Sequence, residues 1–208
     1  MSDSLSSVTA TERLLPWGPV ARGFTWGGGN DLVLLLHEPG ADLDAWGHLP
    51  AFLDRQLEVT VASFDLPGHG LSDDPWCPER TSDLLETLLA ASSGRRFVVA
   101  ARSIATTALM HASDLQLSGL ACLSPDAPEA YPLTRSPRVP KLFVTGAKAG
   151  DDLGEARRLA TASGGWAVVT ALPVLDRGTG LLEGSWTARV WEEIAAFVRD
   201  CQQPARIH

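Results

Sequence analysis

Short apolar runs alternate with amphipathic segments along most of this 208-residue chain, and no other feature limits its fold as strongly. Runs rich in Val, Leu and Phe are typical of strands that are buried on both faces. They occupy residues 32–37, 59–64, 97–101, 119–123, 141–145 and 166–172. Strands that alternate with helices predict an α/β fold, a mostly parallel twisted sheet with helices on both faces. Ligands bind such sheets beyond the carboxyl ends of the strands, so we expect the functional residues in the loops after these runs.

The segments around these runs predict helices and chain boundaries. Leucines at helical spacing predict a helix that Thr81 or Ser82 can cap, and residues 152–163 and 186–198 each carry one apolar stripe. Pro and Gly within residues 14–26 predict an antiparallel hairpin at the edge of the sheet. We expect a flexible tail over residues 1–11, a single domain over residues 12–203 and a short tail over residues 204–208.

The composition argues against several classes of partner. The formal net charge of −8 disfavours nucleic acids and anionic membrane surfaces as the main partner. No apolar stretch approaches the roughly 20 residues that a membrane span needs. Cys77, Cys122 and Cys201 match no zinc or redox spacing, so we expect no metal and no organic cofactor. The start of the chain lacks the basic cluster and apolar core of a secretory signal, and the expected location is the cytoplasm.

Three segments carry a more specific signal. Residues 37–40 read His-Glu-Pro-Gly after the first apolar run, and residues 65–70 read Asp-Leu-Pro-Gly-His-Gly after the second. The third apolar run leads into Ala-Arg-Ser-Ile-Ala at residues 101–105. Together these segments resemble the α/β-hydrolase family, and the resemblance extends over nearly the whole chain from about residue 14. It implies the α/β-hydrolase fold, with a serine nucleophile on a sharp strand-to-helix turn.

The resemblance places the nucleophile at Ser103. Ala101 and Ala105 replace the two glycines of the family's G-x-S-x-G pattern, and both are small enough for the strained turn. The oxyanion hole is then expected at the amide of Ile104 and in the loop of Glu38. Glu38 stands where the family usually has glycine, and its carboxylate would oppose a developing oxyanion. The alternative for Ser103 is that it only caps a core helix.

The resemblance also implies an acid and a histidine later in the chain, and the histidine is missing. Two alignments place Arg177 or Thr179 at the histidine position, and neither side chain accepts a proton at neutral pH. Asp151 and Asp126 are alternative candidates for the acid, although each is also an ordinary turn residue. Asp152 fits better as the N-cap of the helix that follows. A serine without a base is a poor nucleophile.

The surroundings of the expected pocket depart from the family as well. His37, Arg102 and Tyr131 are expected to line it, with His37 supporting the oxyanion loop as it usually does in the family. Glu38, Arg102 and Arg177 either form an ion cluster that fills the site or point to solvent. Large family members insert a helical cap after the sixth strand, whereas the corresponding segment here is short and rich in proline. We therefore expect an open pocket without a cap domain.

These departures predict a non-catalytic relative that keeps the fold for binding or scaffolding. Its expected partners are a small molecule, an acyl-type substrate or another protein. One alternative is an active serine hydrolase that acts on small esters or thioesters with an unusual base. A non-hydrolytic enzyme that uses the same pocket is a further alternative, because one fold hosts many chemistries.

Overall fold

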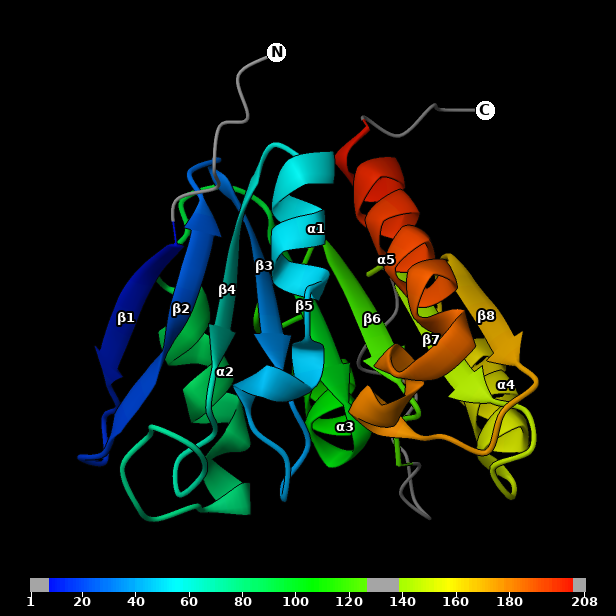
Figure 1. The fold of residues 1–208 in the computed structure, drawn as a ribbon, viewed down its shortest axis with the longest axis horizontal. Helices are drawn as coiled ribbons and strands as arrows, with labels where there is room; N and C mark the ends of the chain where they lie inside the picture. The colour runs from blue at the N-terminus through cyan, green and yellow to red at the C-terminus, as the bar shows by residue number, and fades with distance from the viewer. Residues whose placement is uncertain (1–7, 127–138, 204–208) are drawn as a thin grey trace.

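The computed structural model describes residues 8–126 and 139–203 and contains one eight-stranded sheet with strand order β1-β2-β4-β3-β5-β6-β7-β8 (Figure 1). The strands are β1 Val8–Leu14, β2 Val20–Gly27, β3 Asp31–Leu36, β4 Val59–Phe64, β5 Arg96–Ala101, β6 Gly119–Leu123, β7 Lys141–Gly146 and β8 Ala167–Leu172. β2 is antiparallel to both of its neighbours, whereas every pair from β4 across to β8 is parallel. The six predicted parallel strands are each confirmed to within one residue.

The edge hairpin is longer than the sequence suggests. β1 pairs with β2 over its whole length, from Val8 opposite Trp26 to Leu14 opposite Val20. Residues 8–11 therefore belong to the sheet, and their prediction as part of a flexible tail was wrong. β1 is an edge strand and is largely exposed, so its sequence mixes polar and apolar residues and lacks the apolar run that marks the inner strands.

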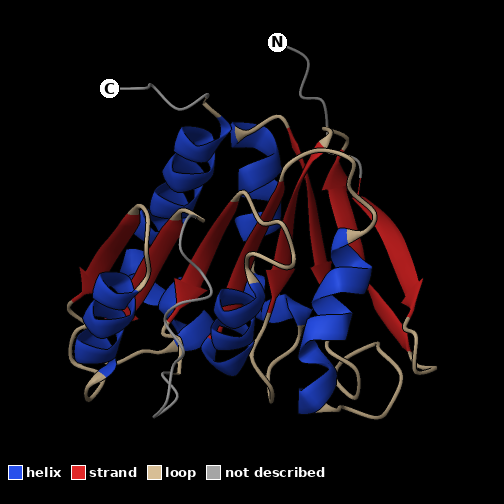
Figure 2. Ribbon diagram, turned by 180° about the vertical axis from the view of Figure 1, so that it is seen from behind, coloured by secondary structure: helices blue, strands red, loops and turns tan. Residues whose placement is uncertain are grey.

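Helices cover both faces of the sheet, as predicted (Figures 1 and 2). One face carries α1 Leu49–Gln56 and α5 Thr187–Gln202, and the other carries α2 Thr81–Leu89, α3 Arg102–His111 and α4 Asp152–Ala162. Short 3₁₀ helices lie at η1 Leu43–Trp46, η2 Pro78–Arg80, η4 Gly178–Leu182 and η5 Gly184–Trp186. Alternate residues of β3 enter opposite cores: Leu34 packs with the helices of the α3 face, and Leu35 with those of the α5 face.

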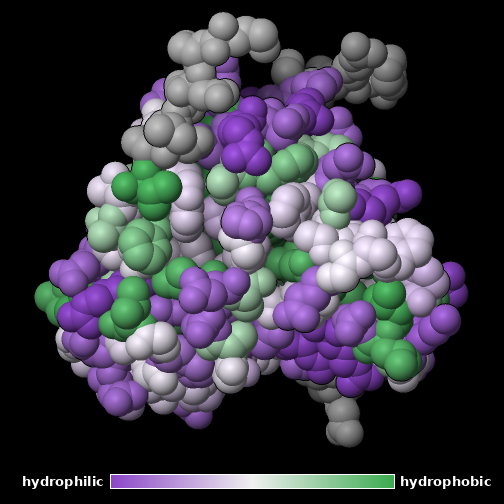
Figure 3. Space-filling view, in the orientation of Figure 1, coloured by the Kyte–Doolittle hydropathy of each residue, from purple (hydrophilic) through white to green (hydrophobic). Residues whose placement is uncertain are grey.

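The surface offers scattered rather than continuous apolar residues. In Figure 3 the face that carries α1 and α5 mixes hydrophilic and hydrophobic side chains. The exposed large apolar residues lie apart from one another in the sequence, at Val8, Leu14, Leu71, Trp166 and Leu175. Within the described residues, no helix is both long enough and apolar enough to span a bilayer, and none of these residues builds a cap domain over the sheet.

Candidate functional site

The loops that follow β3, β5, β6 and β8 meet at one edge of the sheet, where the parallel strands all end (Figure 1). A cavity of about 380 Å³ opens there, which we call the cluster cavity. Its described lining consists of Glu38, Pro39, Arg102, Ser103, Asp126 and Arg177. Side chains that are far apart in the sequence are thus brought together at the carboxyl ends of the strands, as expected for a parallel sheet.

Arg102 occupies the sharp turn between β5 and α3. β5 stays paired through Ala101, which lies opposite Leu123, and Arg102 then adopts a φ of +51° as α3 begins. A left-handed conformation is strained for a residue with a Cβ atom, and such strain marks the nucleophile position of a strand–turn–helix elbow. This differs from the expectation that Ser103 takes the strained position: the turn falls one residue earlier.

Ser103 lies in the first turn of α3 and is exposed at the cluster cavity. Its carbonyl accepts a hydrogen bond from Thr107, but its hydroxyl has no hydrogen-bond partner among the described residues. Ile104 follows as a buried core residue of α3. Ser103 is therefore accessible to a ligand, and no group in the part of the chain that the structure describes accepts a hydrogen bond from its hydroxyl.

His37 and His69, the two histidines beside the loop after β3, are bound to the backbone of that loop and of the loop after β4. His37 is fully buried: its Nε2 accepts a hydrogen bond from the Leu66 amide at 3.0 Å, so its Nδ1 donates to the Glu38 carbonyl at 2.8 Å. Burial lowers the pKa of this imidazole and keeps it neutral. His69 makes the equivalent link to the Gly40 amide at 3.0 Å. Both rings hold the loop after β3 in place. His37 thus supports this loop, but it is fully buried and does not contribute to the described lining of the cavity, where it was expected.

Four charged side chains form what we call the carboxyl-edge cluster: Arg102, Asp126, Asp152 and Arg177. Arg102 pairs with Asp126 and reaches Asp152 at 3.4 Å, and it also donates to the Ser124 carbonyl at 3.0 Å. The Arg177 guanidinium lies 2.9 Å from the other oxygen of Asp152. Asp152, with only 12% of its side chain exposed, therefore stands between two guanidinium groups.

Asp152 is the site residue that the sequence reasoning missed. It is the first residue of α4, and its carboxylate points to the arginines instead of capping the helix. Asp151, the expected acid, is exposed and contributes nothing to the described lining of the cavity. Asp126, the alternative acid, does line the cavity, where it is paired with Arg102. Tyr131 lies outside the described residues.

Glu38 ties the loop after β3 to the loop after β8. Its carboxylate accepts hydrogen bonds from the amide and the hydroxyl of Thr179, each at 3.1 Å. The predicted ion cluster is therefore only partly correct: the two arginines take part in it, but they pair with aspartates while Glu38 binds Thr179. Gly178, at φ +55°, permits this contact, because a Cβ atom there would lie 2.4 Å from a Glu38 oxygen.

The described site holds two guanidinium groups and three carboxylates, and Arg177 keeps part of its guanidinium side chain exposed. Arg177 also donates to the Ala149 carbonyl at 2.5 Å, yet 45% of its side chain is exposed at the cavity. A guanidinium has five N–H donors, so several remain available to a ligand. No group of three His, Cys, Asp or Glu among the described residues is arranged to hold a metal ion.

Several solved structures share this architecture. A predicted CIB-like hydrolase from Thermoplasma acidophilum has a TM-score of 0.74 at 14% identity, over 94% of this chain and 100% of that chain. An esterase from Pyrococcus furiosus has a TM-score of 0.74 at 14% identity, over 94% and 93% of the two chains. A monoacylglycerol lipase from Paleococcus ferrophilus has a TM-score of 0.72 at 12% identity, over 88% and 99%. No family model and no curated protein matches the sequence. At these identities the likeness shows the fold alone, and it confirms the fold that the sequence predicts.

Proposed function

The chain has the α/β-hydrolase fold, and we propose that it uses the carboxyl edge of this fold to bind a small polar acid instead of cleaving an ester. The observation that carries the proposal is Asp152, held between the guanidinium groups of Arg102 and Arg177. In a catalytic triad an acid orients an imidazole that takes the proton of the serine. Here the acid pairs with arginine, which stays protonated at physiological pH and cannot act as a base.

The oxyanion side of the site supports the same proposal. Acyl transfer needs hydrogen-bond donors aimed at the oxygen that becomes negative. The Glu38 carboxylate borders the cluster cavity, and its field opposes negative charge at that position. A covalent step at Ser103 would thus lack both a proton acceptor and a favourable field.

Binding a ligand needs neither a proton acceptor nor an oxyanion hole, and the cluster cavity supplies the space and the hydrogen-bond donors that binding does need. Its volume of about 380 Å³ lies within the range of roughly 300–1,000 Å³ that is usual for small-molecule pockets. The exposed guanidinium of Arg177 can receive a carboxylate through paired N–H donors, and the Ser103 hydroxyl offers a further donor beside it. Polar and charged groups dominate the described lining, which favours a hydrophilic ligand, and the exposed guanidinium of Arg177 is the group that favours an acid.

Labelling with a fluorophosphonate probe tests the loss of hydrolytic chemistry. We expect no labelling of the folded wild-type protein above that of the Ser103→Ala variant, because the serine hydroxyl is not activated. An active esterase of the same fold serves as the positive control. Labelling at Ser103 that the alanine variant abolishes would overturn the proposal and favour an active serine hydrolase that acts on small esters or thioesters.

Thermal denaturation with malonate or succinate tests binding. A ligand that binds only the folded state raises the melting temperature. We expect both acids to raise it in the wild type and not in Arg177→Gln. Arg189→Gln is the matched control, since Arg189 is a surface arginine that pairs with Glu193 on α5. An equal rise in Arg177→Gln and in the wild type would contradict the assignment of the site.

A further inference from the structure

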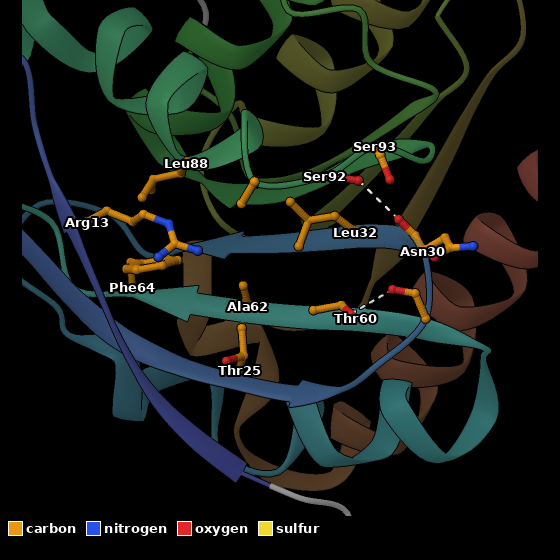
Figure 4. Close-up of a pocket in the computed structure, with 12 residues that line it drawn as sticks. Arg13, Thr25, Asn30, Leu32, Thr60, Ala62, Phe64, Leu88, Ser92 and Ser93 are labelled. Carbon is orange, nitrogen blue, oxygen red and sulfur yellow. Dashed lines mark hydrogen bonds between the residues drawn. The ribbon is translucent and has the colours of Figure 1, made fainter.

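A second cavity of about 270 Å³ lies on the sheet face covered by α2 (Figure 4). We call it the α2 cavity. It is lined by residues from β1, β2, β3 and β4, by the end of α2 and by the loop after it, and it shares no described lining residue with the cluster cavity. These residues are Arg13, Thr25, Gly29, Asn30, Leu32, Thr60, Ala62, Phe64, Leu88, Ala91, Ser92 and Ser93.

The middle of the α2 cavity is apolar. Leu32 of β3 and Ala62 and Phe64 of β4 form its floor, and Leu88 of α2 faces them from the opposite side (Figure 4). All four side chains belong to the core on this face of the sheet, yet they border open space here. Apolar surface around an unfilled space favours an apolar ligand segment, because the contact removes that surface from water.

One end of the cavity is polar without being charged. Figure 4 shows Asn30, Ser92, Ser93 and Thr60 at the end away from Arg13. The Ser92 hydroxyl donates to the Asn30 carbonyl at 3.1 Å, and the Thr60 hydroxyl donates to the Gly29 carbonyl at 2.8 Å. The protons of both hydroxyls are thus already committed, and this end offers no positive charge to an anion.

Arg13 supplies the charge at the opposite end. Its guanidinium reaches over Phe64 into the cavity (Figure 4) and makes one hydrogen bond, to the Glu12 carbonyl at 2.9 Å. Arg22, on the other strand of the same hairpin, pairs with the carboxylates of Glu12 and Asp73. Arg13 has no carboxylate partner among the described residues, and none of the described lining residues is Asp or Glu.

From these features we infer that the α2 cavity binds a small carboxylic acid with an apolar chain. The carboxylate pairs with Arg13, and the chain extends over Leu32, Ala62 and Phe64 towards Asn30. A guanidinium binds a carboxylate through two parallel N–H···O hydrogen bonds, and such a pair selects the acid over a neutral analogue. The whole chain has a net charge of −8, so its overall charge does not attract an anion. The selectivity of the α2 cavity for an anion therefore comes from Arg13.

Calorimetric titration with sodium hexanoate and with hexanol tests the inference, because the two probes share a chain and differ in charge. We expect the wild type to bind hexanoate about tenfold or more tightly than hexanol, the factor expected for one charge-assisted contact. Arg13→Gln removes this preference, and Arg13→Lys restores part of it. Ala62→Leu fills the floor and weakens both probes, and circular dichroism checks that each variant is folded.

Arg177→Gln distinguishes this site from the cluster cavity. We expect the preference for hexanoate over hexanol to persist in Arg177→Gln, because Arg13 still supplies the charge at the α2 cavity, whether or not the proposed acid site at Arg177 passes its own test. Hexanoate that binds no better than hexanol to the wild type would overturn the inference. A preference for hexanoate that is lost in Arg177→Gln and kept in Arg13→Gln would overturn it too, since the carboxylate would then lie in the cluster cavity.

Discussion

Asp152 forms ion pairs with two arginines that are far apart in the sequence. Arg102 begins α3 and Arg177 precedes η4, so each guanidinium reaches Asp152 from a different loop. The carboxylate is nearly buried, and its two oxygens face two cations. Removing a charged partner from such an arrangement costs more than the pair contributes, because the groups left behind lose their compensation.

Asp152→Asn is therefore expected to lower the free energy of unfolding by about 1–3 kcal/mol. Urea denaturation at neutral pH measures this loss. Asp151→Asn is the matched control: Asp151 adjoins Asp152 in the chain but is exposed, so its change should stay within about 0.5 kcal/mol. Equal effects of the two substitutions would mean that the cluster contributes nothing to stability.

His37 predicts a pH dependence of stability. Burial lowers its pKa below the ordinary value of about 6.5, so the unfolded chain binds a proton at this residue before the folded chain does. The stability that the neutral His37 ring contributes is fully present above about pH 6.5 and is lost as the pH falls below that value. We expect an NMR titration to give a His37 midpoint below 6.5, and His37→Gln to reduce the slope of stability just below pH 6.5. A His37 midpoint at or above 6.5 would contradict this.

At the scale of elements, η4 is held against the loop after β3 by the close approach of Gly178 to Glu38. A Cβ atom at residue 178 would also lie 3.0 Å from a carbon of Arg102. Gly184, between η4 and α5, has a positive φ as well, but a Cβ atom there would meet nothing within 4 Å. A substitution at Gly184 thus introduces backbone strain alone, whereas a substitution at Gly178 introduces strain together with a steric clash.

Gly178→Ala is expected to destabilise the protein by about 2–4 kcal/mol, because strain and overpacking add. Gly184→Ala should cost only the strain of about 1 kcal/mol. Chemical denaturation of both variants measures the difference. Similar losses for the two would show that the loop after β8 moves to accommodate the methyl group, and that the Glu38–Thr179 contact is not tightly packed.

Local sequence patterns predict the strands and helices, but they do not predict which residue occupies the sharp turn between β5 and α3. Continuous apolar runs such as residues 119–123 predict buried strands to within a residue. Ala100, Ala101 and Ala105 are all small, so the sequence allows the turn at Ser103 as well as at Arg102. In the structure β5 stays paired through Ala101, and the positive φ falls at Arg102. Asp152 could not be placed either, since its partners lie on long side chains from distant loops.

At the scale of the whole molecule, the fold brings side chains from distant loops to one edge of the sheet. The parallel strands β5, β7 and β8 lead to the loops that bring Arg102, Asp152 and Arg177 to one edge of the sheet, and His37 supports the loop beside them. We propose that Arg102, Asp152 and Arg177 stand at the nucleophile, acid and base positions of a catalytic triad, and the two arginine side chains cannot perform that chemistry.

Restoring these two side chains should therefore restore reactivity towards a fluorophosphonate. In Arg102→Ser/Arg177→His, Asp152 is expected to orient the new imidazole, and the new serine stands on the strained turn. A general base contributes about 10²–10⁴ to such rates, so labelling at residue 102 should exceed that of either single variant by at least about tenfold. Peptide mass mapping identifies the labelled residue. A folded double variant that stays unlabelled would show that the loops after β5 and β8 do not present their side chains to each other, and that the likeness to hydrolases ends with the backbone.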